Sequence, residues 1–205
     1  MQTQDIVQII EHSLVTASTY FESVATGQLS NLDGNVIRMP EYWITAKLMQ
    51  DLHKQGLAAF PEVRINEDIE YFEFGGGRFL GGNDFCKLKG AKIDLFICDR
   101  SSRPGNLRLR VALEIKSMKS SWSAVRADLD RLQELKRVAA GNEQEFIFAY
   151  VSGPLLDKEK VEEDKNLEKY TRLSLNDFKV RKSLRPSVAS TEGCERYSYS
   201  YLHRC

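Results

Sequence analysis

The feature that most constrains the fold is a pair of strand-like apolar segments separated by one amphipathic stretch. The segments are LRLRVALEIKS at residues 107–117 and EFIFAYVSG at residues 145–153. Between them, valine and leucine recur at three- and four-residue spacing, which predicts an amphipathic helix over about 123–140. A strand, a helix and a strand joined in this order form a right-handed crossover. The sequence therefore predicts two parallel strands with a helix packed across them.

A further strand is predicted just before this unit. In AKIDLFIC, residues 91–98, both alternating faces are mostly apolar, which is typical of a strand inside a sheet. The turn-rich segment DRSSRPGN connects it to LRLRVALEIKS, so the two strands are expected to form an antiparallel hairpin. Alternation along the second strand of this hairpin puts Arg110, Glu114 and Lys116 on one face.

The preceding elements complete an α/β pattern. Amphipathic helices are predicted over residues 4–26 and from Pro40 to Gly56, and one or two strands are predicted within residues 62–74. The segment GGGRFLGGND, residues 75–84, is rich in glycine but lacks the GK[ST] ending of a phosphate loop. It therefore predicts a wide, mobile turn.

Residues 154–205 form an extension of different composition. A charge run, LLDKEKVEEDKNLEKY, predicts a solvated helix, and the basic segment after it is expected to pack at the edge of the core. The segment YSYSYL, residues 197–202, alternates as an edge strand does. No internal repeat or clear linker is visible, so residues 1–205 are expected to form one domain with a core of about 40–152.

Composition excludes several classes of protein. Hydrophobic residues make up 42% of the chain, enough to bury a core. The 29 lysines and arginines balance 29 aspartates and glutamates, which argues against coating nucleic acid by bulk charge but leaves room for a local basic cleft. No apolar run approaches the ~20 residues needed to span a bilayer, and the first residues lack the basic region of a secretory signal. The four cysteines have no CxxC spacing, so we expect reduced thiols in a cytoplasmic protein.

Four acid-x-lysine triplets occur in the chain, but only Glu114–Lys116 lies in an apolar strand. With the hairpin connection centred near Pro104, Asp94 falls opposite Glu114, with Cβ atoms ~5 Å apart, and Lys116 lies on the same face. Adjacent buried carboxylates repel each other unless a proton or a cation lies between them, and Mg²⁺ readily takes carboxylate oxygens. A simpler interpretation stays open, in which Lys116 is a strand-end lysine paired with Glu114.

Glu41 is a further candidate, in the helix that begins at Pro40. At about 100° per residue it falls within about 20° of Leu48 and Leu52, so it is expected on the buried stripe of its helix. The alternative is a first-turn glutamate that is stabilised by the helix dipole.

These residues together resemble the PD-(D/E)XK nuclease superfamily over about residues 40–152. The matching motifs are KIDLFIC with Asp94, LEIK with Glu114 and Lys116, and the helix EYWITAKLMQDL with Glu41. The resemblance implies an α/β restriction-endonuclease-like fold, an α-β-β-β-α-β core with a central mixed sheet flanked by helices. An N-terminal helix and a C-terminal extension are added to it here. The family's proline before the aspartate is isoleucine in this chain, so the signature is loose.

The same resemblance assigns roles to these residues. Asp94 and Glu114 would bind Mg²⁺, or Mn²⁺ in its place, together with the peptide carbonyl of Ile115. Lys116 would be the catalytic lysine that assists the attacking water, and Glu41 would be an outer or second-metal acid.

Basic residues after the last motif are candidate contacts for the substrate. Lys119, Arg126 and Arg131 could line the rim of a cleft, and Asp130 could lie near the site as well. The alternative for the helical residues is an ordinary wet face with i,i+4 ion pairs.

The resulting hypothesis is a Mg²⁺-dependent endonuclease that cuts DNA in restriction, repair or phage defence. RNA is less favoured as a substrate because the chain has no aromatic motif of the RNP1 kind. Cutting both strands would call for a homodimer, or for a larger defence or repair complex. The alternative is a catalytically inactive module that uses the same fold for binding or assembly.

Overall fold

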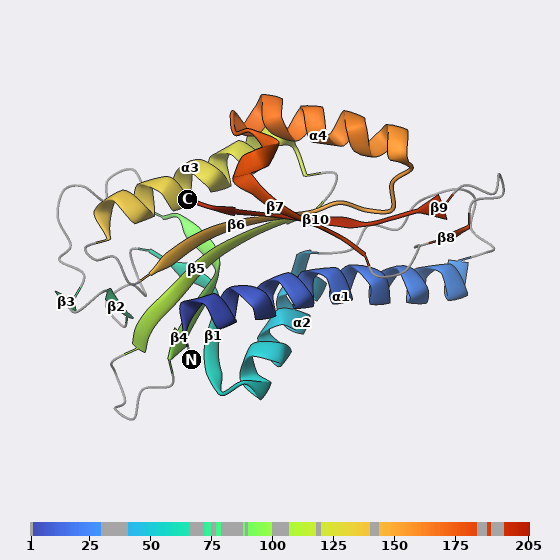
Figure 1. The fold of residues 1–205 in the computed structure, drawn as a ribbon. Coiled ribbons are helices and arrows are strands. Elements are labelled where there is room, and N and C mark those ends of the chain that lie inside the picture. Colours follow the sequence, from blue (N-terminus) through green and yellow to red (C-terminus); the bar gives the residue numbers. More distant parts are fainter. Residues whose placement is uncertain are drawn as a thin grey trace.

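The computed structural model describes residues 2–29, 41–65, 72–74, 77–78, 88, 90–99, 107–117, 120–139, 144–183, 188–189 and 195–205. A mixed β-sheet lies between two layers of helices (Figure 1). One face is covered by α1 (Thr3–Leu29) and α2 (Glu41–Lys54), and the other by α3 (Trp122–Val138) and α4 (Asp157–Thr171). The predicted α/β class, with a mixed sheet flanked by helices, is therefore confirmed.

The main sheet has the strand order β1-β4-β5-β6-β10-β7. The short strand β2 also pairs with β5, and β3 pairs with β2. Its strands are β1 (Leu57–Arg64), β2 (Phe72–Phe74), β3 (Gly77–Arg78), β4 (Lys92–Asp99), β5 (Leu107–Ser117), β6 (Glu145–Val151), β7 (Phe178–Lys182) and β10 (Tyr199–Arg204). A separate pair is formed by β8 (Val188–Ala189) and β9 (Glu195–Arg196), and one 3₁₀ turn, η3, spans Leu175–Asp177. Among the described helices, none has an apolar stretch long enough to cross a bilayer.

The predicted crossover of β5, α3 and β6 is confirmed. β5 and β6 are parallel, and their register sets Glu114 beside Phe148 and Lys116 beside Tyr150. The helix α3 begins after Ser121, whose hydroxyl accepts a hydrogen bond from the N–H of Ala124 at 3.3 Å. Its leucine and valine stripe is fully buried against the sheet.

Two apolar layers hold the sheet between the helices. Leu113 and Ile115 of β5 pack with α1 and α2, whereas Ala112 packs on the opposite side with the stripe of α3. The side chains of Glu114 and Lys116, which alternate with Leu113 and Ile115, therefore point to the α3 side of the sheet.

The prediction for Arg110 is wrong, because β5 contains a β-bulge. Ile97 pairs with Val111, but the next residue, Cys98, pairs with Leu109, so Arg110 is an extra residue in β5. Its guanidinium reaches Asp99 at 3.1 Å and the hydroxyl of Thr3 in α1 at 2.9 Å. Arg110 therefore leaves the face that carries Glu114 and Lys116.

Two strand predictions also need correction. The segment predicted as an edge strand at 197–202 corresponds to β10, which lies inside the sheet between β6 and β7. The strand predicted from residue 62 begins earlier, at Leu57, and includes Pro61. Proline is tolerated there because β1 is an edge strand, in which one row of N–H groups needs no partner.

The other predicted elements agree with the structure where it describes them. The helices expected at 4–26 and from Pro40 to Gly56 correspond to α1 and α2, although Pro40 itself lies outside the described residues. The charge run of the extension forms α4, and the basic segment after it forms the edge strand β7. Within the glycine-rich segment 75–84 only the strand β3 is described, so the predicted turn lies largely outside the described residues.

Candidate active site

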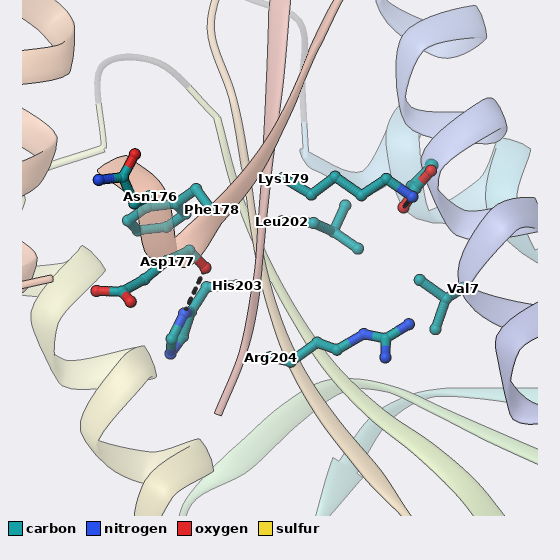
Figure 2. Close-up of a pocket in the computed structure, with 9 residues that line it drawn as sticks. Val7, Asn176, Asp177, Phe178, Lys179, Leu202, His203 and Arg204 are labelled. Atoms are coloured by element: carbon teal, nitrogen blue, oxygen red, sulfur yellow. Dashed lines mark hydrogen bonds and ion pairs between the residues drawn. The ribbon is translucent and has the colours of Figure 1, made fainter. Parts of the chain in front are cut away.

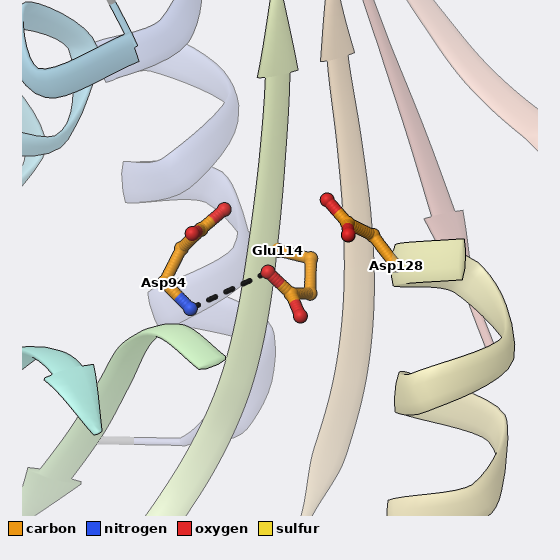
Figure 3. A group of neighbouring side chains, drawn as sticks. All are labelled: Asp94, Glu114 and Asp128. Atoms are coloured by element: carbon orange, nitrogen blue, oxygen red, sulfur yellow. Dashed lines mark hydrogen bonds between the residues drawn. The ribbon is translucent and has the colours of Figure 1, made fainter. Parts of the chain in front are cut away.

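Three carboxylates from three different elements meet on the α3 side of the sheet. They belong to Asp94 of β4, Glu114 of β5 and Asp128 of α3 (Figure 3). One oxygen of each lies within 4.8 Å of the others. Glu114 is fully buried and Asp128 nearly so, whereas Asp94 is partly buried. We call Asp94, Glu114 and Asp128 the acid cluster.

The hairpin register brings the first two acids together as predicted. Leu95 pairs with Leu113, so one step further along the hairpin Asp94 faces Glu114. At this position the backbone N–H groups donate to side-chain carboxylates of the opposite strand. The N–H of Asp94 donates to Oε2 of Glu114 at 3.4 Å, and the N–H of Ile115 donates to Oδ2 of Asp94 at 2.8 Å. Both carboxylates are thus oriented by the backbone of the opposite strand.

Lys116 joins the site through the acids on either side of it. Its ammonium lies 2.8 Å from Oδ2 of Asp128 and 3.4 Å from Oε2 of Glu41, and only 14% of its side chain is exposed. Glu114 pairs instead with Arg131, at 3.0 Å. The alternative in which Lys116 is simply the ion-pair partner of Glu114 is therefore wrong.

Arg131 bridges two members of the acid cluster. Its guanidinium contacts the carboxylates of both Glu114 and Asp128. The prediction that Arg131 could lie near the site is therefore confirmed for its position, although its contact with substrate is untested.

Asp128 is the site residue that the sequence interpretation missed. It stands three residues after Val125 and four before Leu132, and both of these are buried on the stripe of α3. An acid at that spacing on an apolar stripe is the signal that could have identified it, because an unpaired carboxylate would not be buried there.

The other predicted substrate contacts lie elsewhere. Arg126 forms an i,i+4 ion pair with Asp130 at 2.7 Å and donates to the backbone carbonyl of Thr171. This agrees with the alternative interpretation, in which Arg126 lies on an ordinary solvated face of the helix. Neither Arg126 nor Asp130 contacts the acid cluster in any described interaction. Lys119 lies outside the described residues.

Glu41 lies at the margin of the site rather than inside the acid cluster. It precedes Ile44, Leu48 and Leu52 on the buried stripe of α2, as predicted, but 37% of its side chain is exposed. Its Oε1 accepts hydrogen bonds from the N–H of Ser117 at 3.2 Å and the hydroxyl of Ser120 at 2.9 Å. Glu41 therefore ties the start of α2 to the end of β5 and to Lys116.

Burial and mutual repulsion control the protonation of the site. Burial raises the pKa of Glu114 well above its usual range, and the neighbouring carboxylates of Asp94 and Asp128 raise it further. Burial also raises the pKa of Asp94, although the hydrogen bond from Ile115 opposes the change. Burial works against the charge of Lys116, but the carboxylates of Asp128, Asp94 and Glu41 together outweigh it, so the pKa of Lys116 is raised and the ammonium stays protonated.

This donor set fits a hard divalent cation. When all groups are ionised, the four carboxylates of Glu41 and the acid cluster face the two cations Lys116 and Arg131, which leaves a formal charge of −2. Mg²⁺ and Mn²⁺ take carboxylate and carbonyl oxygens. Such an ion would have to compete with Arg131 and Lys116 for the same oxygens.

A cavity of about 440 Å³ lies apart from these residues, between α1 and the β10–β7 edge of the sheet. Its lining side chains lie on both sides of β10 (Figure 2). Glu11, which lines it, lies 2.5 Å from Lys179 of the same lining and 2.8 Å from the neighbouring Arg181. No member of the acid cluster lines this cavity, and its ion pairs suggest a contact that fixes α1 on the sheet.

Comparisons of the chain with protein-family models, with curated proteins and with solved structures gave no match. The functional interpretation therefore depends on the residues of the site.

Proposed function

We propose that the protein is a divalent-metal-dependent endonuclease of the PD-(D/E)XK kind, which hydrolyses phosphodiester bonds in DNA. In this proposal α2, β1, β4, β5, α3 and β6 form its restriction-endonuclease-like core. The observation that supports it most is the meeting of Asp94, Glu114 and Lys116 around the end of the β4–β5 hairpin. Metal-dependent hydrolysis of a phosphodiester needs two acids to hold the metal and a lysine beside the attacking water. Asp94 comes from KIDLFIC, and Glu114 and Lys116 come from LEIK, in the order that the superfamily has.

The metal ligands in this proposal are Asp94, Glu114 and the carbonyl of Ile115, with Asp128 as a third carboxylate. A bound Mg²⁺ or Mn²⁺ supplies Lewis-acid activation of water and neutralises charge on the phosphate. The hydrogen bond from Ile115 holds the carboxylate of Asp94 in a fixed orientation toward the cluster.

Lys116 acts in the proposed reaction as a cation. Because its pKa is raised, it is a poor base near neutral pH, and its role is to orient the attacking water and to stabilise negative charge on the phosphate. Glu41 positions Lys116 from the margin of the site as an outer acid.

The proposed partner is DNA, and RNA is the less favoured substrate. Restriction, repair and phage defence are the pathways in which such an enzyme would work, in the cytoplasm, as a homodimer or within a larger complex. Arg131 is the candidate phosphate contact closest to the acid cluster.

The test is a cleavage assay on plasmid and oligonucleotide DNA with Mg²⁺, with Mn²⁺ and with a chelator. We expect metal-dependent cleavage that falls by about 10²-fold or more in Lys116→Ala, the size of effect seen when one charge-stabilising donor is removed. The matched control is Lys158→Ala, because Lys158 is an exposed lysine at the start of α4. If no nucleic acid is cut with either metal, or if Lys116→Ala cuts as fast as Lys158→Ala, the proposal is wrong.

One observation favours a second candidate, a catalytically inactive binding or assembly module on the same fold. Lys116 and Arg131 already neutralise part of the acid cluster from within, as in a purely structural ion-pair network. Calorimetry separates the two candidates, since the module would bind neither Mg²⁺ nor Mn²⁺ at millimolar concentration.

A further inference from the structure

Three aromatic rings stack in a row that leads from the sheet to the surface. Tyr150 of β6 stacks on Trp122 at the start of α3, with centroids 5.7 Å apart and planes inclined by 26°. Trp122 stacks in turn on Tyr170 in the last turn of α4, at 5.2 Å and 10°. Tyr150 is buried, Trp122 is half-buried and Tyr170 is 38% exposed. We call Tyr150, Trp122 and Tyr170 the aromatic row.

The aromatic row begins beside the candidate active site. Tyr150 is the register partner of Lys116 in the parallel β5–β6 pair, so the two side chains lie on the same face of the sheet. Trp122 follows Ser120, whose hydroxyl donates to Glu41. A chain of nucleotides with one phosphate near Lys116 could therefore pass along this row.

Two basic residues flank Tyr170 in the sequence at the exposed end of the row. The ammonium of Lys169 lies over the Tyr170 ring, 5.0 Å from its centre, so a base that stacks there would displace it toward a phosphate. The exposed Arg172 caps α4 two residues after Tyr170. Within the described part of the chain, neither Lys169 nor Arg172 forms an ion pair with an acid. The nearby acid Glu168 accepts a hydrogen bond from the N–H of Leu175 at 2.7 Å instead.

We propose that Tyr170, supported by Trp122, is a stacking subsite for an unpaired nucleobase of a single-stranded DNA segment. The phosphates of that segment would lie against Lys169 and Arg172. This inference rests on the proposed function and narrows its substrate to single-stranded DNA, or to duplexes with a single-stranded flap or gap. An aromatic face can stack only on a base whose own face is exposed, and such stacking next to a cationic groove is how proteins hold single strands.

Other contacts besides the ring of Tyr170 hold α4 in place, and the hydroxyl of Tyr150 also donates to Glu163 of α4. Leu167 and Thr171 are the buried residues of α4, and the side chain of Arg126 in α3 donates to the carbonyl of Thr171. Tyr170 can therefore be changed with less risk to the fold than its buried neighbours.

The experiment measures binding of the full chain to labelled oligonucleotides in a chelator, so that nothing is cleaved. The probes are a single-stranded DNA, the blunt duplex of the same sequence and the matching single-stranded RNA. The variants are Tyr170→Leu, which keeps an apolar contact on Trp122 but removes the ring, and Tyr170→Phe, which keeps the ring. A Trp43→Phe background leaves Trp122 as the sole tryptophan, so that stacking can also be followed by its fluorescence.

We expect the single-stranded DNA to bind more tightly than the duplex and to quench the fluorescence of Trp122. Tyr170→Leu should weaken single-strand binding by about tenfold, and Tyr170→Phe should leave it within about twofold, because the loss of one stacked base is an effect of this size. Wild-type affinity of Tyr170→Leu for the single strand would overturn the inference, as would tighter binding of the duplex. Ring-dependent binding of RNA in preference to DNA would overturn the choice of DNA.

This test is separate from the test of catalysis. If wild-type protein cuts DNA in a Lys116-dependent way but Tyr170→Leu changes neither binding nor cutting, the stacking subsite alone is wrong. If nothing is cut but the ring-dependent binding is found, the nuclease proposal alone is wrong.

Discussion

The backbone N–H of Ile115 in β5 donates a 2.8 Å hydrogen bond to the carboxylate of Asp94 in β4. Regular antiparallel pairing of the two strands reaches Leu95 and Leu113, and the side chains of Asp94 and Glu114 supply hydrogen bonds beyond that point. Burial raises the pKa of both carboxyls, so each holds a proton more tightly than an exposed acid does. A divalent cation would take the place of that proton.

Replacing Asp94 by asparagine should weaken metal binding. The amide keeps the shape of the side chain but removes the negative charge that attracts the ion, and we expect Mn²⁺ affinity to fall by about tenfold to 100-fold in calorimetry. The matched control is Asp99→Asn on the same strand, where the carboxylate pairs with Arg110 at 3.1 Å outside the acid cluster. Equal Mn²⁺ affinities in the two variants would show that Asp94 is not a ligand.

Replacing Asp128 by asparagine should affect both the metal and the lysine. The change removes the carboxylate 2.8 Å from the ammonium of Lys116, so the pKa of Lys116 should fall from its raised value. NMR titration of the lysine side chains follows that pKa, and calorimetry should show weaker Mn²⁺ binding. Asp130→Asn, two residues along α3 and paired with Arg126, should change neither quantity. An unchanged pKa of Lys116 in Asp128→Asn would contradict the ion pair.

Replacing Arg131 by glutamine should make stability depend on the metal. Without metal, the fully buried carboxylate of Glu114 loses its cation, which should cost about 1–3 kcal/mol in the free energy of unfolding. Mg²⁺ should restore much of this loss, because the ion no longer competes with a guanidinium. Urea unfolding with and without Mg²⁺ measures both effects, and Arg137→Gln, at an exposed pair with Glu134, is the control. A deficit that Mg²⁺ leaves unchanged would argue against a metal at Glu114.

Replacing Glu163 by glutamine should reduce the pH dependence of stability. Burial raises the pKa of Glu163 above its value of about 4.5 in an unfolded chain, although the hydroxyl of Tyr150 donates to it and opposes the shift. The folded state therefore binds this proton more tightly, so stability falls as pH rises from about 4.5 through the raised pKa. Urea unfolding at several pH values from 4 to 8 should show a smaller fall for Glu163→Gln than for wild type.

The control for that prediction is Glu62→Gln, because Glu62 is an exposed glutamate of β1 whose ion-pair partner is the exposed Lys92. It should follow the wild-type pH dependence. A steeper fall in Glu163→Gln than in wild type would reverse the sign of the argument.

The core of the site could be predicted from the sequence because its determinants are local. A connection centred near Pro104 predicts the register of the two strands, and the period of two in a strand then places Asp94 opposite Glu114. The triplet Glu114–Lys116 indicates a site only because that register places Asp94 opposite Glu114.

The features that the sequence analysis missed are of two kinds. Some depend on single residues that interrupt a regular spacing, and others on pairing between strands far apart in the sequence. The extra residue Arg110 shifts the alternation at one end of β5, and no period-two pattern reveals where a bulge falls. Asp128 was overlooked among its charged neighbours Arg126 and Asp130, although its spacing from the buried stripe of α3 was a usable signal. The place of β10 inside the sheet depends on partners about 20 and 50 residues earlier, which local patterns do not encode.

The position of β10 also has a consequence for how the chain folds during synthesis. Among the strands that the structure describes, β7, residues 178–182, pairs with β10 alone, and β10 is made later, at residues 199–204. Synthesis proceeds from the N-terminus at about 5–20 residues per second. The strands that carry Asp94 and Lys116 are therefore synthesised before β7 and β10, and the edge of β6 that pairs with β10 stays without this partner until residue 204 has emerged.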